Sequence, residues 1–495
     1  MNLIANGATM FETVGKSLDP ADWTAFRQQA HKMLDDMLDY TENLSSRDVW
    51  QPMPIELQTR LRSPLTEKTL AEAHAEFMRD VLPYAVGNVH PRFMGWVHGG
   101  GTPVGMIAEM LAAGLNANLG GRNQAPIEIE RQVMRWVRDL FGFPETASGV
   151  FVTGTSMANL IGCLCAKTNV NCRCGFSRNH ANNAAKAAPT LLTAYTSTAA
   201  HISVAQSLDI SGIGTNALRK IPVNANDEME VSALEQAIIA DKKAGKTPFL
   251  VVATVGTVDV GAIDDLQKIA ALCQRENAWF HIDGAFGALA MLAPELAPRL
   301  AGIELADSIA FDFHKWGQVP YDAGFVLVRD GDIHQKTFAS PAAYLQRHER
   351  GLSANSPWAC DFGLDLSRGF RALKTWFTLS VYGNEKLGQV VAHTCELAQY
   401  LKREIEASAE LELLAPVALN IVCFRYRCDD ANLVNTELVI VLQESGIAAP
   451  SSTTLNGNVA IRAAIVNHRT TENDIDILLA AVLKFGNALT LNNNL

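Results

Sequence analysis

Short runs of β-branched, aromatic and other apolar residues alternate with longer helical stretches between about residues 147 and 330. The runs are, in chain order, GVFVT, LTAYTS, RKIPV, FLVVAT, WFHID, DSIAFDF and GFVLVR. Each run has the length of a strand and is bounded by glycine, proline or small polar residues. This alternation predicts an α/β domain with a largely parallel sheet that helices cover on both faces.

The hydrophobic pattern changes on both sides of this region. Before it, apolar residues at helical spacing predict an amphipathic helix, with Asp19 as its N-cap and Pro20 at the first helical position. Its apolar stripe has to pack on the main body or on a second subunit, because so short a segment does not fold alone. After the region, helices around 384–408, the strands LNIVCFRYR and VAIRAAIV and a helix from Glu472 predict a smaller α+β domain. We therefore expect a helical segment over 1–89, a large domain over 90–370 and a small domain over 371–495.

Composition and charge argue against several classes of protein. The chain has 495 residues, of which 48% are hydrophobic and 19% charged, and its net charge of −11 is ordinary for a globular protein. It has no basic stripe, so we expect no nucleic-acid partner. No apolar run approaches the ~18 residues of a membrane span and no signal-peptide pattern is present, so we expect a soluble, cytoplasmic protein without a membrane partner. The nine scattered cysteines, among them the closely spaced Cys172 and Cys174, predict reduced thiols and no metal site.

Polar residues directly follow several of the predicted strands, at the sheet edge where α/β proteins bind ligands. Gly154, Thr155 and Ser156 lie between a strand and a helix, where N–H groups and hydroxyls would hold a phosphate or simply cap the helix. Asp283 ends the run WFHID, and a buried carboxylate needs a cation such as a protonated pyridine nitrogen, unless it only caps a helix. His201 follows LTAYTS and could stack on a planar ring or cap a turn.

Lys315 stands in the stretch SIAFDFHKWG, directly after an apolar strand. Lysine is costly to bury, so one alternative is a side chain that extends its ammonium into water at the strand end. A lysine kept uncharged by burial and neighbouring cations is, however, the residue type that forms a Schiff base with an aldehyde. Phosphate, ring nitrogen, ring face and aldehyde together describe pyridoxal 5′-phosphate, so we expect that cofactor.

Six motifs occur in the order seen in the group II pyridoxal-phosphate-dependent amino-acid decarboxylases, the relatives of aromatic-amino-acid, histidine and glutamate decarboxylases. They are HPRFMGW (90–96), TGTSMAN (153–159), TVGTVDVGAIDD (254–265), WFHIDGAFG (279–287), FHKWGQVPYDAG (313–324) and SRGFRALKTW (367–376). The chain resembles this family well over residues 85–380 and more loosely elsewhere. The resemblance implies the aspartate-aminotransferase-like fold, which is fold type I of these enzymes. It also implies a homodimer with active sites at the interface, in which the N-terminal helices pack on the partner.

The resemblance also assigns roles to single positions. Lys315 resembles the lysine that forms the Schiff base, and His314 resembles a neighbour of the phosphate. Asp283 resembles the carboxylate on the pyridine nitrogen. Ala285 is expected against the cofactor ring and His201 on the ring's outer face.

Two departures from the family concern the cofactor and the loop. Thr155 and Ser156 match the phosphate cradle and Thr257 a further cofactor contact, but the threonine that usually follows is Val258 here. Thr257 is otherwise most simply a turn residue. Aromatic decarboxylases of the family carry a loop tyrosine that protonates the substrate carbon, and the corresponding stretch 345–370 contains no tyrosine.

The substrate pocket is expected along MGWVHG and, from the second subunit, along NLGGRN. Trp96 offers a flat apolar wall, and the polar side chains His98, Asn118 and Arg122 add hydrogen-bond donors. The glycines of NLGGRN leave room. These residues predict a substrate that is aromatic with a polar substituent, or polar outright. The alternative is that Arg122 only pairs with the nearby glutamates 128 or 130.

We therefore expect decarboxylation of an L-amino acid to the amine, with Lys315, His201 and Asp283 as the catalytic residues. The missing loop tyrosine leaves open an aldehyde synthase, in which oxygen in place of a proton captures the reacting carbon. An aminotransferase is possible on the fold alone. An inactive scaffold protein is a further alternative, although all the cofactor contacts occur together.

Overall fold

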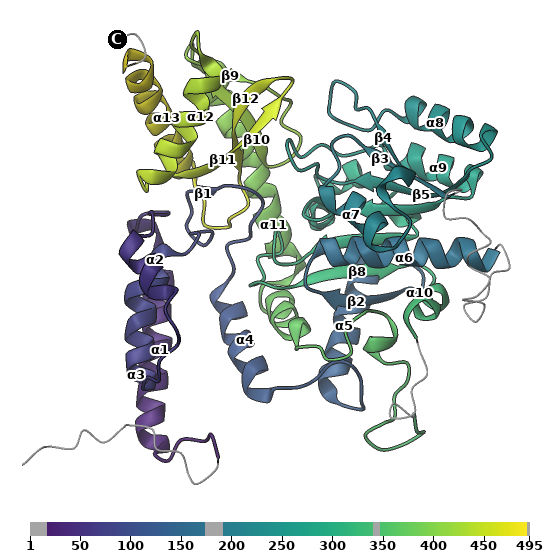
Figure 1. The fold of residues 1–495 in the computed structure, drawn as a ribbon, viewed down its shortest axis with the longest axis horizontal. Helices are drawn as coiled ribbons and strands as arrows, with labels where there is room; N and C mark the ends of the chain where they lie inside the picture. Colours follow the sequence, from purple (N-terminus) through teal and green to yellow (C-terminus); the bar gives the residue numbers. More distant parts are fainter. Residues whose placement is uncertain (1–16, 174–191, 340–346, 493–495) are drawn as a thin grey trace, which may run out of the picture.

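The computed structural model describes residues 17–173, 192–339 and 347–492. A long helix, α11 (Arg371–Ala407), lies between two sheets and contacts elements of both halves of the molecule (Figure 1). The start of the chain, Cys174 and the beginning of the 345–370 stretch lie outside the described residues. Within the described ranges, no helix is long and apolar enough to cross a membrane, and no group of side chains could hold a metal ion.

Within the described residues, the larger sheet has seven strands in the order β2-β8-β7-β6-β5-β3-β4. They are β2 (Ser148–Val152), β3 (Leu192–Ser197), β4 (Leu218–Ile221), β5 (Thr247–Thr254), β6 (Trp279–Asp283), β7 (Ser308–Asp312) and β8 (Gly324–Val328). Among the described strands of this sheet, only β8 runs in the opposite direction to the rest. The predicted α/β architecture with a mostly parallel sheet is therefore confirmed.

Helices cover both faces of this sheet because alternate side chains of each strand point to opposite sides. In β7, Phe311 joins the core on one face and Ala310 the core on the other. The first face carries α5 (Ala125–Leu140), α8 (Val231–Lys243) and α9 (Leu266–Glu276), and the second carries α6 (Thr155–Arg173), α7 (Ile202–Ile210) and α10 (Gly331–Phe338). These layers leave the carboxyl ends of the parallel strands as the place for a site.

The smaller sheet, in the part of the chain that the structure describes, has five strands in the order β1-β11-β12-β10-β9. They are β1 (Phe93–Met94), β9 (Leu411–Leu413), β10 (Ile421–Tyr426), β11 (Ala449–Leu455) and β12 (Asn458–Ala464), with α12 (Ala431–Glu444) and α13 (Glu472–Asn492) beside them. β1 departs from the expected boundary at residue 90, because Phe93 pairs with Ala449 in this sheet. Met94 is fully buried in the core of the smaller domain, and this burial holds the segment there.

The N-terminal segment forms α1 (Trp23–Glu42), α2 (Ile55–Leu61) and α3 (Leu70–Glu76), and α4 (Pro103–Leu115) then packs on α11 (Figure 1). The prediction of Asp19 as the first N-cap is wrong. Asp22 is the cap, because its backbone is extended and its Oδ1 accepts the N–H groups of the residues at 24 and 25 at 2.9 and 3.1 Å. Among the described residues, none of the apolar stripe of α1 is fully buried, and Trp23 is 54% exposed.

Candidate active site

Two buried carboxylates end neighbouring parallel strands of the large sheet. Asp283 is the last residue of β6 and Asp312 is the last residue of β7. Asp283 is 2% exposed and Asp312 is 1% exposed. A buried carboxylate is costly unless it has a cation or hydrogen-bond donors, so partners are expected for both side chains.

Lys315 supplies the cation for Asp312. Its Nζ lies 2.8 Å from Asp312 Oδ2, and its side chain is 22% exposed. Because the ammonium pairs with a buried carboxylate, the alternative of a lysine that extends into water is wrong. Sequence reasoning missed Asp312, although a carboxylate within the apolar run SIAFDF was an available signal.

Asp283 is held by two hydrogen bonds. Asn159 Nδ2 donates to Asp283 Oδ2 at 2.8 Å, and the Ala285 N–H donates to Oδ1 at 3.2 Å. Burial raises the pKa of the Asp283 carboxyl, and the hydrogen bond from Asn159 acts against this rise. Lys315 and His201 lie near enough to lower the same pKa when they are charged. The helix that follows begins with a different N-cap, so the helix-cap alternative for Asp283 is wrong.

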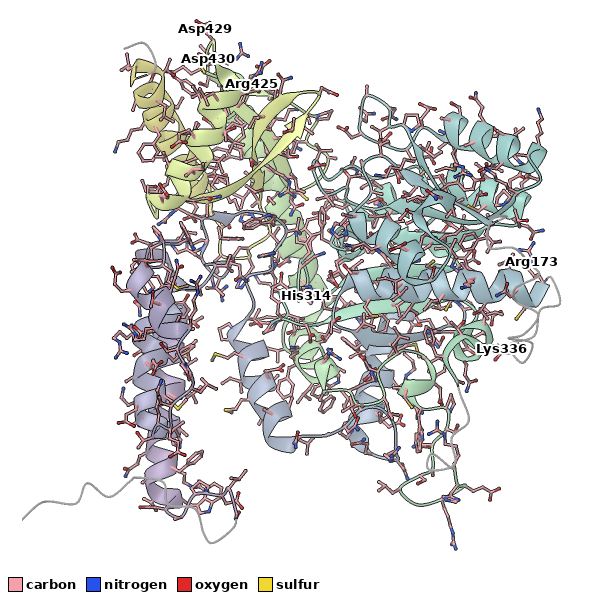
Figure 2. All side chains as sticks on the ribbon, viewed as in Figure 1. Arg173, His314, Lys336, Arg425, Asp429 and Asp430 are labelled. Atoms are coloured by element: carbon pink, nitrogen blue, oxygen red, sulfur yellow. The ribbon has the colours of Figure 1, made fainter. Side chains whose placement is uncertain are left out.

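His314 lies beside Lys315 with its tautomer fixed by its surroundings. Its Nδ1 accepts the Ala323 N–H at 3.0 Å, so a neutral ring carries its proton on Nε2. That Nε2 faces Asp312 Oδ2 at 3.6 Å. Burial lowers the pKa of His314, so the ring is neutral near pH 7. Figure 2 shows His314 near the centre of the molecule, beside α11.

The segment MGWVHG lies against the backbone of Lys315. A Cβ built on Gly99 would come within 2.4 Å of the Lys315 carbonyl oxygen, so a residue without a side chain permits this approach. The rings of Trp96 and His98 stack at 5.9 Å between centroids. Burial and the nearby Lys315 lower the pKa of His98. Trp96 is 55% exposed, so much of its side chain is available to a ligand.

The turn between β2 and α6 carries the expected phosphate cradle. Thr155 is 5% exposed and its Oγ1 has no hydrogen-bond partner among the described residues, whereas Ser156 is exposed. A Cβ built on Gly154 would lie 3.7 Å from both Asp312 Oδ1 and His314 Cε1, so the turn stands beside these two side chains. α6 begins at Thr155, and the first N–H groups of a helix have no intrahelical acceptor.

His201 and Thr257 both have structural roles in their turns. His201 is the N-cap of α7, and its Nδ1 accepts the Ser203 N–H at 3.2 Å. The capping alternative therefore holds for Nδ1, while the exposed ring lies near enough to Asp283 to affect the pKa of that carboxyl. Thr257 is fully buried, and its Oγ1 accepts the Ala262 N–H at 2.9 Å, which makes it a turn residue.

Arg462 is a residue of this region that sequence reasoning missed. It is 3% exposed, and its guanidinium donates to the Val258 carbonyl at 2.6 Å and to the Trp96 carbonyl at 3.3 Å. It thereby ties the smaller domain to two segments that flank the site. The single cation within the apolar strand VAIRAAIV was the available signal.

The segment NLGGRN contacts residues 352–368 of the same chain. The Cys360 N–H donates to the Gly120 carbonyl at 3.0 Å. A Cβ built on Gly121 would lie 2.4 Å from Trp358 Cδ2, so the indole fills the space beside this glycine. Trp358 of the same chain therefore occupies the space beside Gly121, which was expected to leave room for a substrate of the second subunit.

Asn118 and Arg122 are engaged within this same cluster. Arg122 lies over the Trp358 indole, with its Cζ 4.4 Å from the ring centroid. Glu128 and Glu130 pair with other arginines at 2.7 and 2.6 Å, so the alternative of an ion pair with Arg122 is wrong. Asn118 Oδ1 accepts a backbone N–H two residues further on at 2.9 Å. Of the four substrate candidates, His98 lies near Lys315 and Trp96 stacks on His98, whereas Asn118 and Arg122 lie in the NLGGRN cluster of this chain.

Unpaired polar atoms gather at the carboxyl edge of the large sheet. The atoms Thr155 Oγ1, Ser197 Oγ, Thr254 Oγ1 and Asp312 Oδ1 are buried and have no hydrogen-bond partner among the described residues. Ser197 and Thr254 end β3 and β5, so they lie at the edge that also carries Asp283 and Lys315. Buried polar groups are normally satisfied, so this gathering fits a ligand with several polar groups. The phosphate, ring nitrogen and aldehyde of pyridoxal phosphate match these hydroxyls, carboxylates and amine.

Comparisons with known proteins agree with this fit. Residues 59–427 match the model of the pyridoxal-dependent decarboxylase conserved domain. The chain is 32% identical to an aromatic-L-amino-acid decarboxylase of Bacillus atrophaeus, over 91% of this chain and 93% of that protein. It is 27% identical to a phenylacetaldehyde synthase of Arabidopsis thaliana, over 91% and 94%. The crystal structure of Oryza sativa TDC with PLP and tryptamine has the same fold, with a TM-score of 0.86, 24% identity and coverage of 96% and 100%.

Proposed function

The chain belongs to the pyridoxal-dependent decarboxylase family and is a pyridoxal-phosphate-dependent amino-acid decarboxylase, and we propose that Lys315 is the residue that holds its cofactor. The observation that carries this proposal is the cluster at the ends of β6 and β7. There the Lys315 Nζ lies 2.8 Å from the Asp312 carboxylate, and Lys315 is near enough to Asp283 to affect the pKa of its carboxyl. An amine and a second buried carboxylate so close together suit different parts of one ligand.

Asp283 is suited to hold the ring nitrogen in its protonated form. When bound, pyridoxal phosphate supplies an aldehyde that joins amines and a protonated ring that withdraws electrons from the substrate Cα. An ionised, buried Asp283 needs a cation opposite it, and this keeps a proton on that nitrogen. The unpaired hydroxyl of Thr155 and the first N–H groups of α6 are placed to bind the phosphate. The exposed His201 ring is placed to cover the cofactor and exclude water.

Replacing Lys315 by alanine tests this assignment. The wild-type protein should carry the visible absorbance of bound cofactor and release carbon dioxide from an L-amino acid, and Lys315→Ala should lose both. The control is Lys268→Ala, because that exposed lysine pairs with Asp265 at 2.7 Å on the surface and should be dispensable. An alanine variant at position 315 that keeps the absorbance and the turnover would show that the assignment is wrong.

The substrate that we propose is aromatic with a polar substituent, or polar outright. Trp96 supports this with an apolar surface stacked on His98, and His98, near Lys315, supports it with ring nitrogens that can hydrogen-bond. Amine detection against a panel of all L-amino acids identifies the substrate. Trp96→Ala should lower kcat/KM for an aromatic substrate by about tenfold, the effect of an aromatic contact of roughly 1.5 kcal/mol. Phenylalanine as the best wild-type substrate would contradict this proposal.

The product that we propose is the amine. One observation favours an aldehyde instead, because residues 345–370 contain no tyrosine that could deliver a proton. An oxygen electrode with a peroxide assay separates the two products. Turnover without oxygen uptake supports the amine, whereas uptake in step with carbon dioxide release establishes the aldehyde. An aminotransferase would instead require a keto-acid acceptor, which product analysis with and without that acceptor would reveal.

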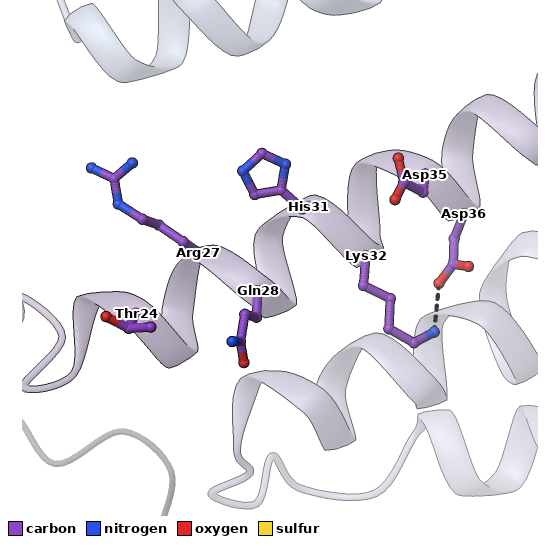
Figure 3. A pocket seen from close by; sticks show the side chains of 7 residues that line it. All are labelled: Thr24, Arg27, Gln28, His31, Lys32, Asp35 and Asp36. Carbon is purple, nitrogen blue, oxygen red and sulfur yellow. Dashed lines mark hydrogen bonds and ion pairs between the residues drawn. The ribbon is translucent and has the colours of Figure 1, made fainter.

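A homodimer with active sites at the interface, in which α1 packs on the partner, is also part of this proposal. The support for it is that no residue of α1 is fully buried in its own chain and that Trp23 is 54% exposed. Figure 3 shows the polar side chains that line a surface pocket of α1, where Lys32 pairs with Asp36 at 3.0 Å. Light scattering should give twice the chain mass of 53.7 kDa. Trp23→Glu should weaken this dimer, whereas Leu433→Glu, at a position 64% exposed on α12, should not. A monomeric wild-type protein overturns the proposal.

We also infer a cytoplasmic location. The described cysteines are all free thiols, as expected in a reducing compartment. Cell fractionation followed by thiol labelling checks this, since disulfide-linked cysteines would contradict it.

A further inference from the structure

A chain of buried hydrogen bonds runs across the large sheet to Asp283. Trp279 Nε1 donates to Ser308 Oγ at 2.8 Å, and Ser308 Oγ lies 2.7 Å from His281 Nδ1. His281 Nε2 lies 2.9 Å from Asn159 Oδ1. Asn159 Nδ2 then donates to Asp283 Oδ2 at 2.8 Å. Each of these side chains is at most 4% exposed, so water does not compete for the bonds.

The donors and acceptors give this chain a single direction. A carboxylate only accepts, so Asp283 takes the Nδ2 end of the Asn159 amide and Asn159 Oδ1 faces His281 Nε2. Burial lowers the pKa of His281 to about 3, so the ring is neutral and carries its proton on Nε2, which donates to Asn159 Oδ1. His281 Nδ1 then accepts the Ser308 proton, and Ser308 Oγ accepts from the Trp279 indole N–H, which can only donate.

Asn159 also reaches the histidine of the site. Its Nδ2 donates to Ser203 Oγ at 3.0 Å as well as to Asp283, so both N–H bonds of the amide are used. Ser203 Oγ lies 2.8 Å from His201 Nδ1. Because this hydroxyl already accepts from Asn159, its own proton is available to that nitrogen. One amide thus orients the Asp283 carboxylate directly and the His201 ring through a serine.

We propose that Asn159 is a positioning residue for decarboxylation, which fixes the Asp283 carboxylate and the His201 ring relative to each other. The inference rests on the proposed function, because it assigns Asp283 to the cofactor ring nitrogen. Asn159 is the last residue of the motif TGTSMAN, whose threonine and serine were assigned to the phosphate. The same turn of α6 would therefore serve both ends of the cofactor.

The hydrogen bond from Asn159 also favours the ionised form of Asp283. Burial favours the neutral acid, and this bond is the largest of the effects that favour the ionised form. The charged groups that act on Asp283 from the neighbouring elements are Lys315, after β7, and His201, before α7. The Ala285 N–H adds a weaker hydrogen bond at 3.2 Å. Loss of the asparagine donor should therefore raise the pKa of Asp283.

A pH titration of the cofactor-loaded protein tests the proposal. In Asn159→Ala, Asp283 should take up its proton at higher pH, and an ionised Asp283 is needed opposite the ring nitrogen. The acid limb of kcat/KM and the accompanying change in the visible spectrum of bound cofactor should both move up by about one pH unit. A role confined to packing would lower stability and leave the position of the acid limb unchanged.

Ser203→Ala is the matched control for this titration. It cuts the branch to His201 and keeps the bond between Asn159 and Asp283, so the acid limb should stay at the wild-type pH. If Asn159→Ala does not fold, Asn159→Ser keeps one shorter donor and should give a smaller shift in the same direction. An unshifted acid limb in the asparagine variants, or an equal shift in Ser203→Ala, overturns the inference. A wild-type protein that binds no cofactor would instead overturn the proposed function.

Discussion

Adding one methyl group at Gly121 should destabilise the protein, because Trp358 already occupies the space. A Cβ built there lies 2.4, 2.5 and 2.6 Å from the Cδ2, Cε3 and Cγ atoms of the indole, well inside van der Waals contact. The indole has little freedom to move, since Trp358 is 1% exposed and its Nε1 donates to the Ala354 carbonyl at 3.0 Å. The guanidinium carbons of Arg122 and Arg347 lie 4.4 and 3.4 Å from its ring centroid.

The expected cost of Gly121→Ala is about 1–3 kcal/mol, the usual range for overpacking a filled site. Gly114→Ala is the matched control, because a Cβ at this position in α4 meets no atom within 4 Å. Alanine is a better helix former than glycine, so the control should gain about 0.5–1 kcal/mol. The same chemical change should therefore have opposite signs at the two positions.

Urea unfolding followed by far-ultraviolet circular dichroism measures both effects. Repeating Gly121→Ala in a Trp358→Leu background should lower its cost, because the smaller side chain gives way to the new methyl group. A Gly121→Ala variant as stable as the wild type would refute the reasoning that the indole fills this space. An unchanged cost in the leucine background would refute the assignment of the clash to Trp358.

Further outcomes follow from the buried charges. Glu130→Gln should lower the free energy of unfolding, measured in urea, by about 3–5 kcal/mol, because it removes the charge opposite a buried arginine at 2.6 Å. Glu128→Gln, on the surface, should change that free energy by no more than about 0.5 kcal/mol. Lys315→Ala should lower the stability of the cofactor-free protein by about 3 kcal/mol by leaving Asp312 without its cation, and adding Asp312→Asn should restore most of it. Burial lowers the pKa of His334 to about 3 in the folded protein, whereas the same side chain in the unfolded chain has a pKa of about 6.5. Between these two values only the unfolded chain binds the proton, so stability falls as the pH drops. His334→Phe should reduce the slope of unfolding free energy between pH 6 and 4 by up to about 1.4 kcal/mol per pH unit, and an unchanged slope would contradict this.

The sequence by itself determined the features that depend on local pattern. Apolar runs bounded by turn residues located the strands of the large sheet, because a side-chain period and a strand length are properties of a few neighbouring residues. Asp283 and Lys315 stood out for the same reason, as charged residues at the ends of apolar runs. Local pattern was less reliable at the start of α1. Asp19 and Asp22 are equally good N-cap residues by type, and in the structure Asp22 caps the helix.

The tertiary structure decided which distant residues meet. Asn159 and Asp283 are separated by 124 positions and Arg462 and Val258 by 204, and no local pattern pairs them. The glycines of NLGGRN illustrate the same limit, because the sequence shows that a side chain is missing but not what fills the space. In the fold Trp358 fills it. Such contacts depend on how whole layers pack, since burial and close packing act between elements that have already formed.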